Sequence, residues 1–246
     1  MSAPFATVVV DGNAPTVVEW AARLARSAKA SLTRVAVESD ETMPSTLAGE
    51  VERTGADLVV IARREPSSAP WLRLDGVLHQ IIERSRVPVA VVPESWRGEE
   101  VPSRVGVGMD GSPRSQVAAG WAAAFAGSVG ALVWVVHAAD VGPALAGAGD
   151  PGAGYDATLR DRRAIADQEW ASPLRAAGVT YETVVEDGPP VGLLFESTKK
   201  YALDLLVVGA RGADEDAVAR LGSVAHRVAG LAPCPCVIVP PRFNRT

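Results

Sequence analysis

The chain has 246 residues, of which 48% are hydrophobic and 22% are charged, a composition typical of a globular, water-soluble protein. Its formal net charge of −5 and the lack of a basic run argue against nucleic acid as the main partner. The two cysteines, Cys234 and Cys236, are too few and too close in sequence for a disulfide framework. Residues 1–7 lack the basic start and the apolar core of a signal peptide, so we expect a cytoplasmic protein.

Short runs rich in aliphatic residues predict strands in the first part of the chain, at 7–11, 32–37, 57–61 and 89–92. The last of these runs is followed by a polar segment, residues 93–102, that begins and ends with proline. Because a polar, proline-bracketed segment after a strand is typical of a linker, we expect two domains, residues 1–97 and 98–246.

The second part of the chain alternates strands and helices. Strands are expected at 105–109, 131–138, 181–185, 204–208 and 236–239, and helices at 113–126, 156–177, 190–201 and 223–230. Ser112-Pro113 supplies a cap and a first-turn proline for the first of these helices. This alternation predicts an α/β protein with an open parallel sheet covered by helices on both faces.

Residues 118–139 could instead be a membrane span, because they contain no acidic residue, lysine or arginine over a sufficient length. However, Gly127-Ser128-Val129-Gly130 interrupts the run, and residues 132–137 are rich in strand formers. A helix that ends near Gly127, a turn and a buried strand explain the segment better, so we expect no membrane association.

Residues 209–223 carry the strongest functional signal of the chain. Gly209-Ala210-Arg211-Gly212 follows an apolar strand, and Gly222-Ser223 opens a helix nine residues later. Glycines allow positive φ and a close approach of the backbone, and the first amides of a helix have no internal partner. Ser223 can cap the helix or donate a hydroxyl hydrogen bond. The pattern predicts an anion site for a phosphate group; the alternative is a tight turn with a close helix–strand contact.

Three motifs together resemble the universal stress protein family. The spacing Gly-x2-Gly-x9-Gly-Ser is similar to the family's ATP-binding motif. Residues 105–112, Val-Gly-Val-Gly-Met-Asp-Gly-Ser, resemble its first strand and turn, and residues 234–240, Cys-Pro-Cys-Val-Ile-Val-Pro, resemble its last strand. The resemblance covers residues 103–241 and implies a flavodoxin- or Rossmann-like domain that binds ATP.

The resemblance also implies which residues hold the nucleotide. It places Asp110 and the backbone of Ala138 beside the adenosine, although Asp110 could equally be only the turn residue of Asp-Gly-Ser. It assigns the phosphates to the glycines and the serine of the motif, namely Gly209, Gly212, Gly222 and Ser223.

Charged residues near the motif bear on how the phosphates are held. Arg211 could reach a phosphate, and its alternative role is that of a solvated loop cation. Asp214-Glu215-Asp216 lies in the loop, where acids oppose a triphosphate unless a divalent cation bridges them; the alternative is a solvated loop tip. We therefore expect ATP, alone or with Mg²⁺, as the ligand.

The chain also contains an internal repeat. Residues 57–93 match residues 204–240 at an offset of 147, and residues 7–13 match residues 106–112 at an offset of 99. The two offsets differ by 48 residues, so the first copy lacks a middle segment with one strand, and the sequence leaves open which strand that is. Tandem domains are common in the family, so the resemblance implies two tandem domains, the first of them shortened.

The offset of 147 places the four motif positions of the first copy on Ala62, Glu65, Asp75 and Gly76. Two glycines thus become carboxylates, and two like charges about 4 Å apart repel by roughly 4 kcal/mol at an effective dielectric constant of 20. We therefore expect a degenerate, structural first copy and one ATP per chain. The alternative is that the first copy binds another ligand through Arg63 and Arg64.

The final strands of the two copies, 89–92 and 237–239, end their sheets in matching positions. A sheet edge exposes backbone groups that can pair with another strand, and the resemblance implies that these strands pair antiparallel in dimers. We therefore expect the two copies to form an internal pseudo-dimer about a rough two-fold axis. A homodimer of full chains stays open, and the sequence names no protein partner.

No strong catalytic centre is visible in the sequence. His79 and His226 have no partner at metal-ligand spacing, and His137 lies at the end of a core strand. We therefore interpret all three as core or surface histidines, and the cysteines as buried, inert thiols. The leading hypothesis is an ATP-binding stress regulator or sensor with slow ATP hydrolysis at most. The alternatives are a nucleotide-free interaction or scaffold protein of the same fold, and an adenylating or ATP-hydrolysing α/β enzyme.

Overall fold

The computed structural model describes residues 5–64, 76–98, 100–141, 151–212, 221–241 and 243, without the side chains of residues 151–153. The first half of the chain contributes β1 (Thr7–Asp11), α1 (Pro15–Ala28), β2 (Ser31–Val35), α2 (Met43–Thr54), β3 (Leu58–Arg63), α3 (Gly76–Arg84) and β4 (Val89–Pro93). We use "first half" for residues 5–93 and "second half" for residues 104–239.

The second half contributes more elements. Its strands are β5 (Arg104–Gly108), β6 (Leu132–Ala139), β7 (Tyr181–Asp187), β8 (Leu205–Gly209) and β9 (Cys236–Val239). Its helices are α4 (Pro113–Val129), α6 (Pro151–Ile165), the π-helix η1 (Ala166–Trp170), α7 (Ser172–Ala176), α8 (Pro190–Lys200) and α9 (Ser223–Leu231).

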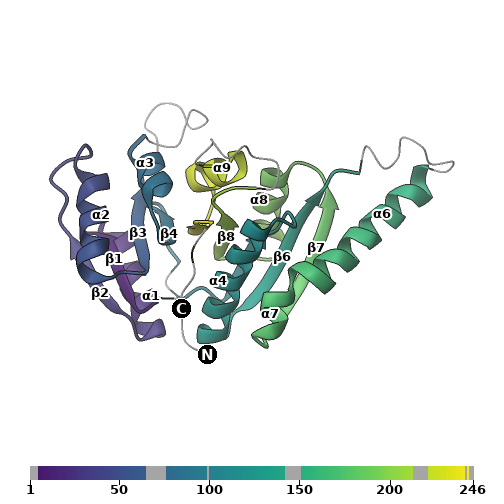
Figure 1. Cartoon of the computed structure of the whole chain (residues 1–246), viewed down its shortest axis with the longest axis horizontal. Helices are drawn as coiled ribbons and strands as arrows, with labels where there is room; N and C mark the ends of the chain where they lie inside the picture. Colours follow the sequence, from purple (N-terminus) through teal and green to yellow (C-terminus); the bar gives the residue numbers. More distant parts are fainter. Residues whose placement is uncertain are drawn as a thin grey trace.

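The described strands form one sheet of nine strands in the order β2-β1-β3-β4-β9-β8-β5-β6-β7. The strands of each half are neighbours in the sheet, and the two halves lie side by side (Figure 1). They meet where β4 of the first half pairs with β9 of the second half. Neighbouring strands are parallel everywhere except at the β4–β9 contact. The predicted parallel order is therefore confirmed within each half.

Each face of the sheet carries one apolar core that continues across both halves. One core includes residues of α1, α4 and α7, and the other includes residues of α2, α3, α8 and α9. Strand β1 shows how the sequence divides between them: Val8 and Val10 belong to the first core and Val9 to the second, because side chains alternate along a strand. Helices cover both faces, which confirms the predicted fold class.

The contact between the halves is symmetric in register. Strands β4 and β9 pair antiparallel through Val89–Ile238, Ala90–Val237 and Val91–Cys236. The offset of 147 relates Ala90 to Val237, so the central pair joins equivalent positions and the two outer pairs exchange under a two-fold rotation. The expected antiparallel pairing of the two final strands is therefore present in the structure.

The topology identifies which part of the first copy is missing. Strand β2 pairs with β1 as β6 pairs with β5, and β2 is the outermost strand on its side of the sheet. Residues 36–42, all described, join β2 to α2, whereas residues 140–189 join β6 to α8 and include α6, η1, α7 and β7. The strand without a counterpart in the first half is thus β7.

Two expected helix boundaries are wrong. Helix α4 does not end near Gly127 but continues to Val129, and Gly130 ends it with φ +74°. One glycine inside a long helix costs only about 1 kcal/mol relative to alanine, so Gly127 does not stop it.

The expected helix 156–177 is also divided, into α6, η1 and α7. Pro173 lies at the start of α7, where a proline is tolerated because its missing N–H would have no helical partner there. In the interior of one continuous helix the same proline would remove a hydrogen bond and clash with the preceding turn. None of the described helices is long and apolar enough to cross a membrane.

Candidate functional site

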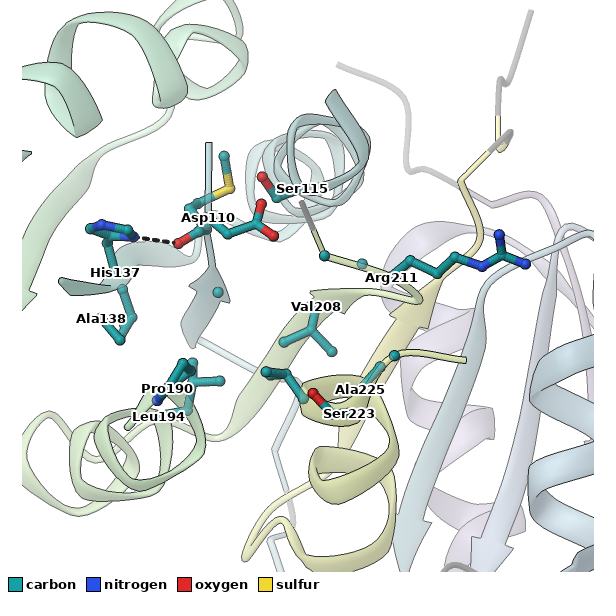
Figure 2. Close-up of a pocket in the computed structure, with 17 residues that line it drawn as sticks. Asp110, Ser115, His137, Ala138, Pro190, Leu194, Val208, Arg211, Ser223 and Ala225 are labelled. Carbon is teal, nitrogen blue, oxygen red and sulfur yellow. Dashed lines mark hydrogen bonds between the residues drawn. The ribbon is translucent and has the colours of Figure 1, made fainter. Parts of the chain in front are cut away.

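A cavity of about 310 Å³ opens at the carboxyl ends of β5, β6 and β8. All seven residues predicted from the sequence line it: Asp110, Ala138, Gly209, Arg211, Gly212, Gly222 and Ser223. They come from four separate segments of the second half, which the parallel sheet brings to one edge (Figure 2). The cavity is therefore where the sequence analysis places the nucleotide.

The turn after β5 forms one wall of the cavity. The Ser112 amide donates to Asp110 Oδ1 over 2.9 Å, which makes Asp110 the turn residue of Asp-Gly-Ser as well as a lining residue. Gly111 has φ +80°, and a Cβ there would lie 2.7 Å from the Trp170 ring. Only glycine fits this position, because both the backbone conformation and the packed indole exclude a side chain.

The glycines after β8 admit a close approach of the backbone. A Cβ at Gly209 would lie 3.2 Å from the Arg114 carbonyl oxygen, and a Cβ at Gly212 would lie 2.9 Å from Asp110 Oδ2. Neither residue has the positive φ expected from the sequence. Their role in the fold is to leave space for neighbouring atoms, since their backbone conformation is open to any residue.

A second contact ties this glycine turn to the start of α4. The Arg114 guanidinium donates to the Gly212 carbonyl oxygen over 3.0 Å. The Arg114 hydrogen bond thus holds the glycine turn next to the start of α4, and the missing side chain of Gly212 leaves room for the Asp110 carboxylate.

Helix α9 begins at the cavity. Gly222 is its N-cap, with extended φ and ψ of −75° and 159°, and the cap has no side-chain hydrogen bond. Of the two roles considered for Ser223, that of the helix cap is wrong, because Ser223 is the first helical residue; that of a hydroxyl donor stays a prediction. Ser223, Val224 and Ala225 line the cavity, and the first amides of a helix form a favourable site for an anion.

Arg211 lines the cavity with part of its surface, but its guanidinium points away from the other labelled residues (Figure 2). This direction favours the interpretation of Arg211 as a loop cation over that of a phosphate ligand. The acidic residues 214–216 lie outside the described residues.

His137 is buried beside the cavity. Its Nδ1 lies 2.8 Å from the Met109 carbonyl oxygen, which can only accept, so Nδ1 carries the proton. Its ring meets the Trp170 ring edge-on, with 4.6 Å between the centroids. Burial lowers the pKa of His137, so the ring is neutral at pH 7. This agrees with the expectation of a core or surface histidine. Through Trp170, η1 packs against His137, which lines the cavity.

The apolar wall of the cavity was not predicted from the sequence. That wall is made mainly by Val136, Val208, Pro190, Leu194 and Ala225. Val136 and Val208 could have been found as residues next to strand ends. Pro190 and Leu194 come from α8, whose position above the sheet no sequence spacing reveals.

The buried cysteines agree with the expectation of inert thiols. Burial raises the pKa of the Cys236 thiol to about 12, and it raises the pKa of Cys234 as well. Nor does the described part of the chain bring together three metal-ligating side chains.

The first half has a much smaller counterpart of the cavity, of about 20 Å³. It is lined in part by Asp11, Ala62 and Arg64, which the internal repeat aligns with Asp110, Gly209 and Arg211. Two residues of the degenerate motif, Glu65 and Asp75, lie outside the described residues. Arg64 forms an ion pair with Asp40 over 2.9 Å.

The chain is similar to known proteins of one family. The model of the "Universal stress protein family" matches residues 102–240. A universal stress protein of Thermus aquaticus is 31% identical over 53% of this chain and 93% of its own length. The universal stress protein YxiE of Bacillus subtilis is 39% identical, over 25% of this chain and 42% of its own length.

The fold of the whole chain, both halves included, is similar to a solved structure. A universal stress protein from Archaeoglobus fulgidus covers 97% of this chain and 97% of its own, with a TM-score of 0.63 and 15% identity. Since the family model matches more than half of the residues and the Thermus relative is matched over nearly its full length, the chain belongs to the universal stress protein family.

Proposed function

We propose that this chain binds one ATP, in the cavity of its second half, and acts as a nucleotide-dependent stress regulator or sensor in the cytoplasm. The observation that carries the proposal is the convergence of all seven predicted residues on one cavity. Its volume of about 310 Å³ lies at the lower end of the range of about 300–1,000 Å³ for small-molecule sites.

The chemistry of the walls supports a nucleotide. The aliphatic residues Val136, Leu194 and Val208 suit the flat, largely apolar base. Asp110 offers a carboxylate to a ribose hydroxyl, and the Ala138 backbone lies on the same side of the cavity (Figure 2). Gly212, Gly222 and the first turn of α9 suit phosphates, because main-chain amides and the helix dipole favour an anion.

The titratable side chains among the described lining residues are Asp110, His137 and Arg211. His137 holds its Nδ1 proton in a bond to the backbone, and Asp110 Oδ1 accepts from Ser112. These bonds serve the fold, so we propose slow ATP hydrolysis at most. The two halves would act as an internal pseudo-dimer, for which the symmetric β4–β9 register is the support.

This function is tested by calorimetric unfolding with ATP and by the nucleotide that the purified protein carries. If one folded-state site exists, ATP–Mg at about 100 times Kd should raise the free energy of unfolding by about 2.7 kcal/mol. Chromatography of the denatured protein should release an adenine nucleotide. An unchanged melting temperature at millimolar ATP, with no nucleotide released, would instead support the nucleotide-free scaffold, which the acidic residues 214–216 favour.

A further inference from the structure

Helix α9 connects the cavity to the first half of the chain. Its first turn, Ser223 to Ala225, lines the cavity. Ala232, immediately after its last residue, accepts a hydrogen bond from Arg63 Nη1 over 2.8 Å. Arg63 is the last residue of β3, so this bond joins the end of a first-half strand to the far end of the helix that begins at the cavity.

Both partners of this bond are held in place. Arg63 pairs with Pro93 in the β3–β4 ladder, and its carbonyl accepts from the Glu94 amide over 3.0 Å. Ala232 is fully buried, and its amide donates to the Val228 carbonyl over 3.0 Å. The guanidinium therefore bridges two fixed pieces of backbone, and its geometry depends on how the two halves sit against each other.

A cation suits this position for a physical reason. The last carbonyls of a helix have no intrahelical donor, and the helix dipole makes that end negative. An arginine side chain can donate a hydrogen bond to such a carbonyl and also place its positive charge near the negative end of the helix dipole. Ala232 is the C-cap of α9, with an extended ψ of 136°, and its amide still donates to Val228 inside the helix, so the bond to Arg63 holds the residue at which this nine-residue helix ends.

The pseudo-symmetry of the molecule shows that this support acts in one direction. At the offset of 147, Arg63 corresponds to Ala210 and Ala232 corresponds to Ser85. Ala210 has no side-chain donor, so no reciprocal bond to Ser85 can form. The neighbouring His79–His226 contact, in contrast, joins equivalent positions, with 5.6 Å between the ring centroids. The asymmetric contact supports the half that has the large cavity.

We propose that Arg63 of the first half is a positioning residue for the nucleotide site of the second half, acting through α9. This inference rests on the proposed function, because it assigns the first half a part in binding at that site. It gives a physical reason for the first half, whose described counterpart of the cavity is small, to remain joined to the half with the large cavity.

The test compares three variants of the full chain. Arg63→Met removes the donors and the charge but keeps an unbranched side chain, and Arg63→Lys keeps the charge. Arg64→Met is the matched control: it makes the same change at the next residue, whose ion pair with Asp40 is half exposed on both sides. The ATP Kd is measured by titration calorimetry well below the melting temperature, and hydrogen exchange is followed in α9.

We expect Arg63→Met to raise the ATP Kd by about tenfold, the size associated with one charged hydrogen bond. Hydrogen exchange should become faster at the start of α9, Arg63→Lys should recover part of the affinity, and Arg64→Met should stay within about twofold of the natural chain.

An unchanged ATP Kd for Arg63→Met would overturn the proposal for Arg63 and leave the proposed function intact. A lower melting temperature beside that unchanged Kd, with unchanged exchange in α9, would show that Arg63 only stabilises the fold. If the natural chain itself binds no ATP, the proposed function is wrong and the role of Arg63 is wrong with it. The binding isotherm of the natural chain therefore separates the two failures.

Discussion

The two halves of the molecule place similar backbone around very different cavities. The cavity of the second half is about 310 Å³, and its counterpart in the first half is about 20 Å³. The internal repeat shows why, because several lining positions of the first half carry larger side chains. These replacements are Leu78 for Ala225, Ile61 for Val208 and Ala62 for Gly209.

Topology positions a site in each half, whereas side-chain size decides whether that site is open. Both halves keep an aspartate at the carboxyl end of their first strand, Asp11 in β1 and Asp110 just after β5, and in both its Oδ1 accepts from the amide two residues later. The turn is thus retained in the half whose described counterpart of the cavity is only about 20 Å³. An aspartate at this turn is therefore weak support for a ligand unless the volume beside it is open.

The largest effect is expected from closing the open cavity with a charge. Gly212→Glu places a side chain where even a Cβ would lie 2.9 Å from Asp110 Oδ2 and opposes the phosphates with a second carboxylate. We expect a loss of ATP affinity of about a thousandfold, from a repulsion of roughly 4 kcal/mol. Gly120→Ala is the control, because its Cβ meets nothing within 4 Å. Unchanged affinity in Gly212→Glu would show that phosphates bind elsewhere.

A smaller effect, on stability, is expected from opening the closed cavity. Leu78 is buried in the apolar core under α3, so Leu78→Ala should lower the free energy of unfolding by about 2–5 kcal/mol. It should not create a second ATP site, since the other enlarged residues remain. Urea unfolding and the calorimetric stoichiometry check both statements. A second bound ATP in this variant would mean that one side chain closes the first half.

A smaller loss of ATP affinity is expected when two lining residues of the second half are replaced by their larger counterparts from the first half. Val208→Ile with Ala225→Leu should fill part of the large cavity and weaken ATP binding about 10- to 100-fold, the range expected for overpacking by 1–3 kcal/mol. The melting temperature without ATP measures any damage to the fold. Full affinity in the double variant would show that these walls do not contact the ligand.

The smallest effect concerns pH. Burial holds the pKa of His137 below its usual value in the folded protein, so the unfolded chain takes up the proton more readily. Stability should therefore be highest above about pH 6.5 and fall as the pH drops through the unfolded-state pKa. Urea unfolding at pH 7.5 and 5.5 should show this decrease, and His137→Gln should reduce it. An equal decrease in that variant would assign the effect to other groups.

Much of this architecture could be predicted because its signals are local. Strand alternation, the Ser112-Pro113 helix start and the glycine spacing each occupy a few consecutive residues, and the residues they predict meet in one cavity. The antiparallel pairing of the final strands was expected from the resemblance to the family, and the register of Ala90 with Val237 follows the repeat.

What could not be predicted depends on packing between distant segments. Pro190 and Leu194 belong to the cavity only because α8 covers that face of the sheet, and the closure of the first half depends on summed side-chain volume. The Arg63–Ala232 bond joins residues 169 positions apart and has no local pattern. The glycines of the motif do line the cavity, as predicted; of the two reasons given for them, the close approach of the backbone agrees with the structure, whereas positive φ is wrong for Gly209 and Gly212.

The central claim is that one nucleotide binds per chain, in the second half. Titration calorimetry of the full chain with ATP–Mg, repeated with Gly212→Glu, tests it most directly. We expect one ATP per chain for the natural sequence and no measurable binding for the variant. Two ATP per chain, or one ATP that remains bound in Gly212→Glu, would contradict it.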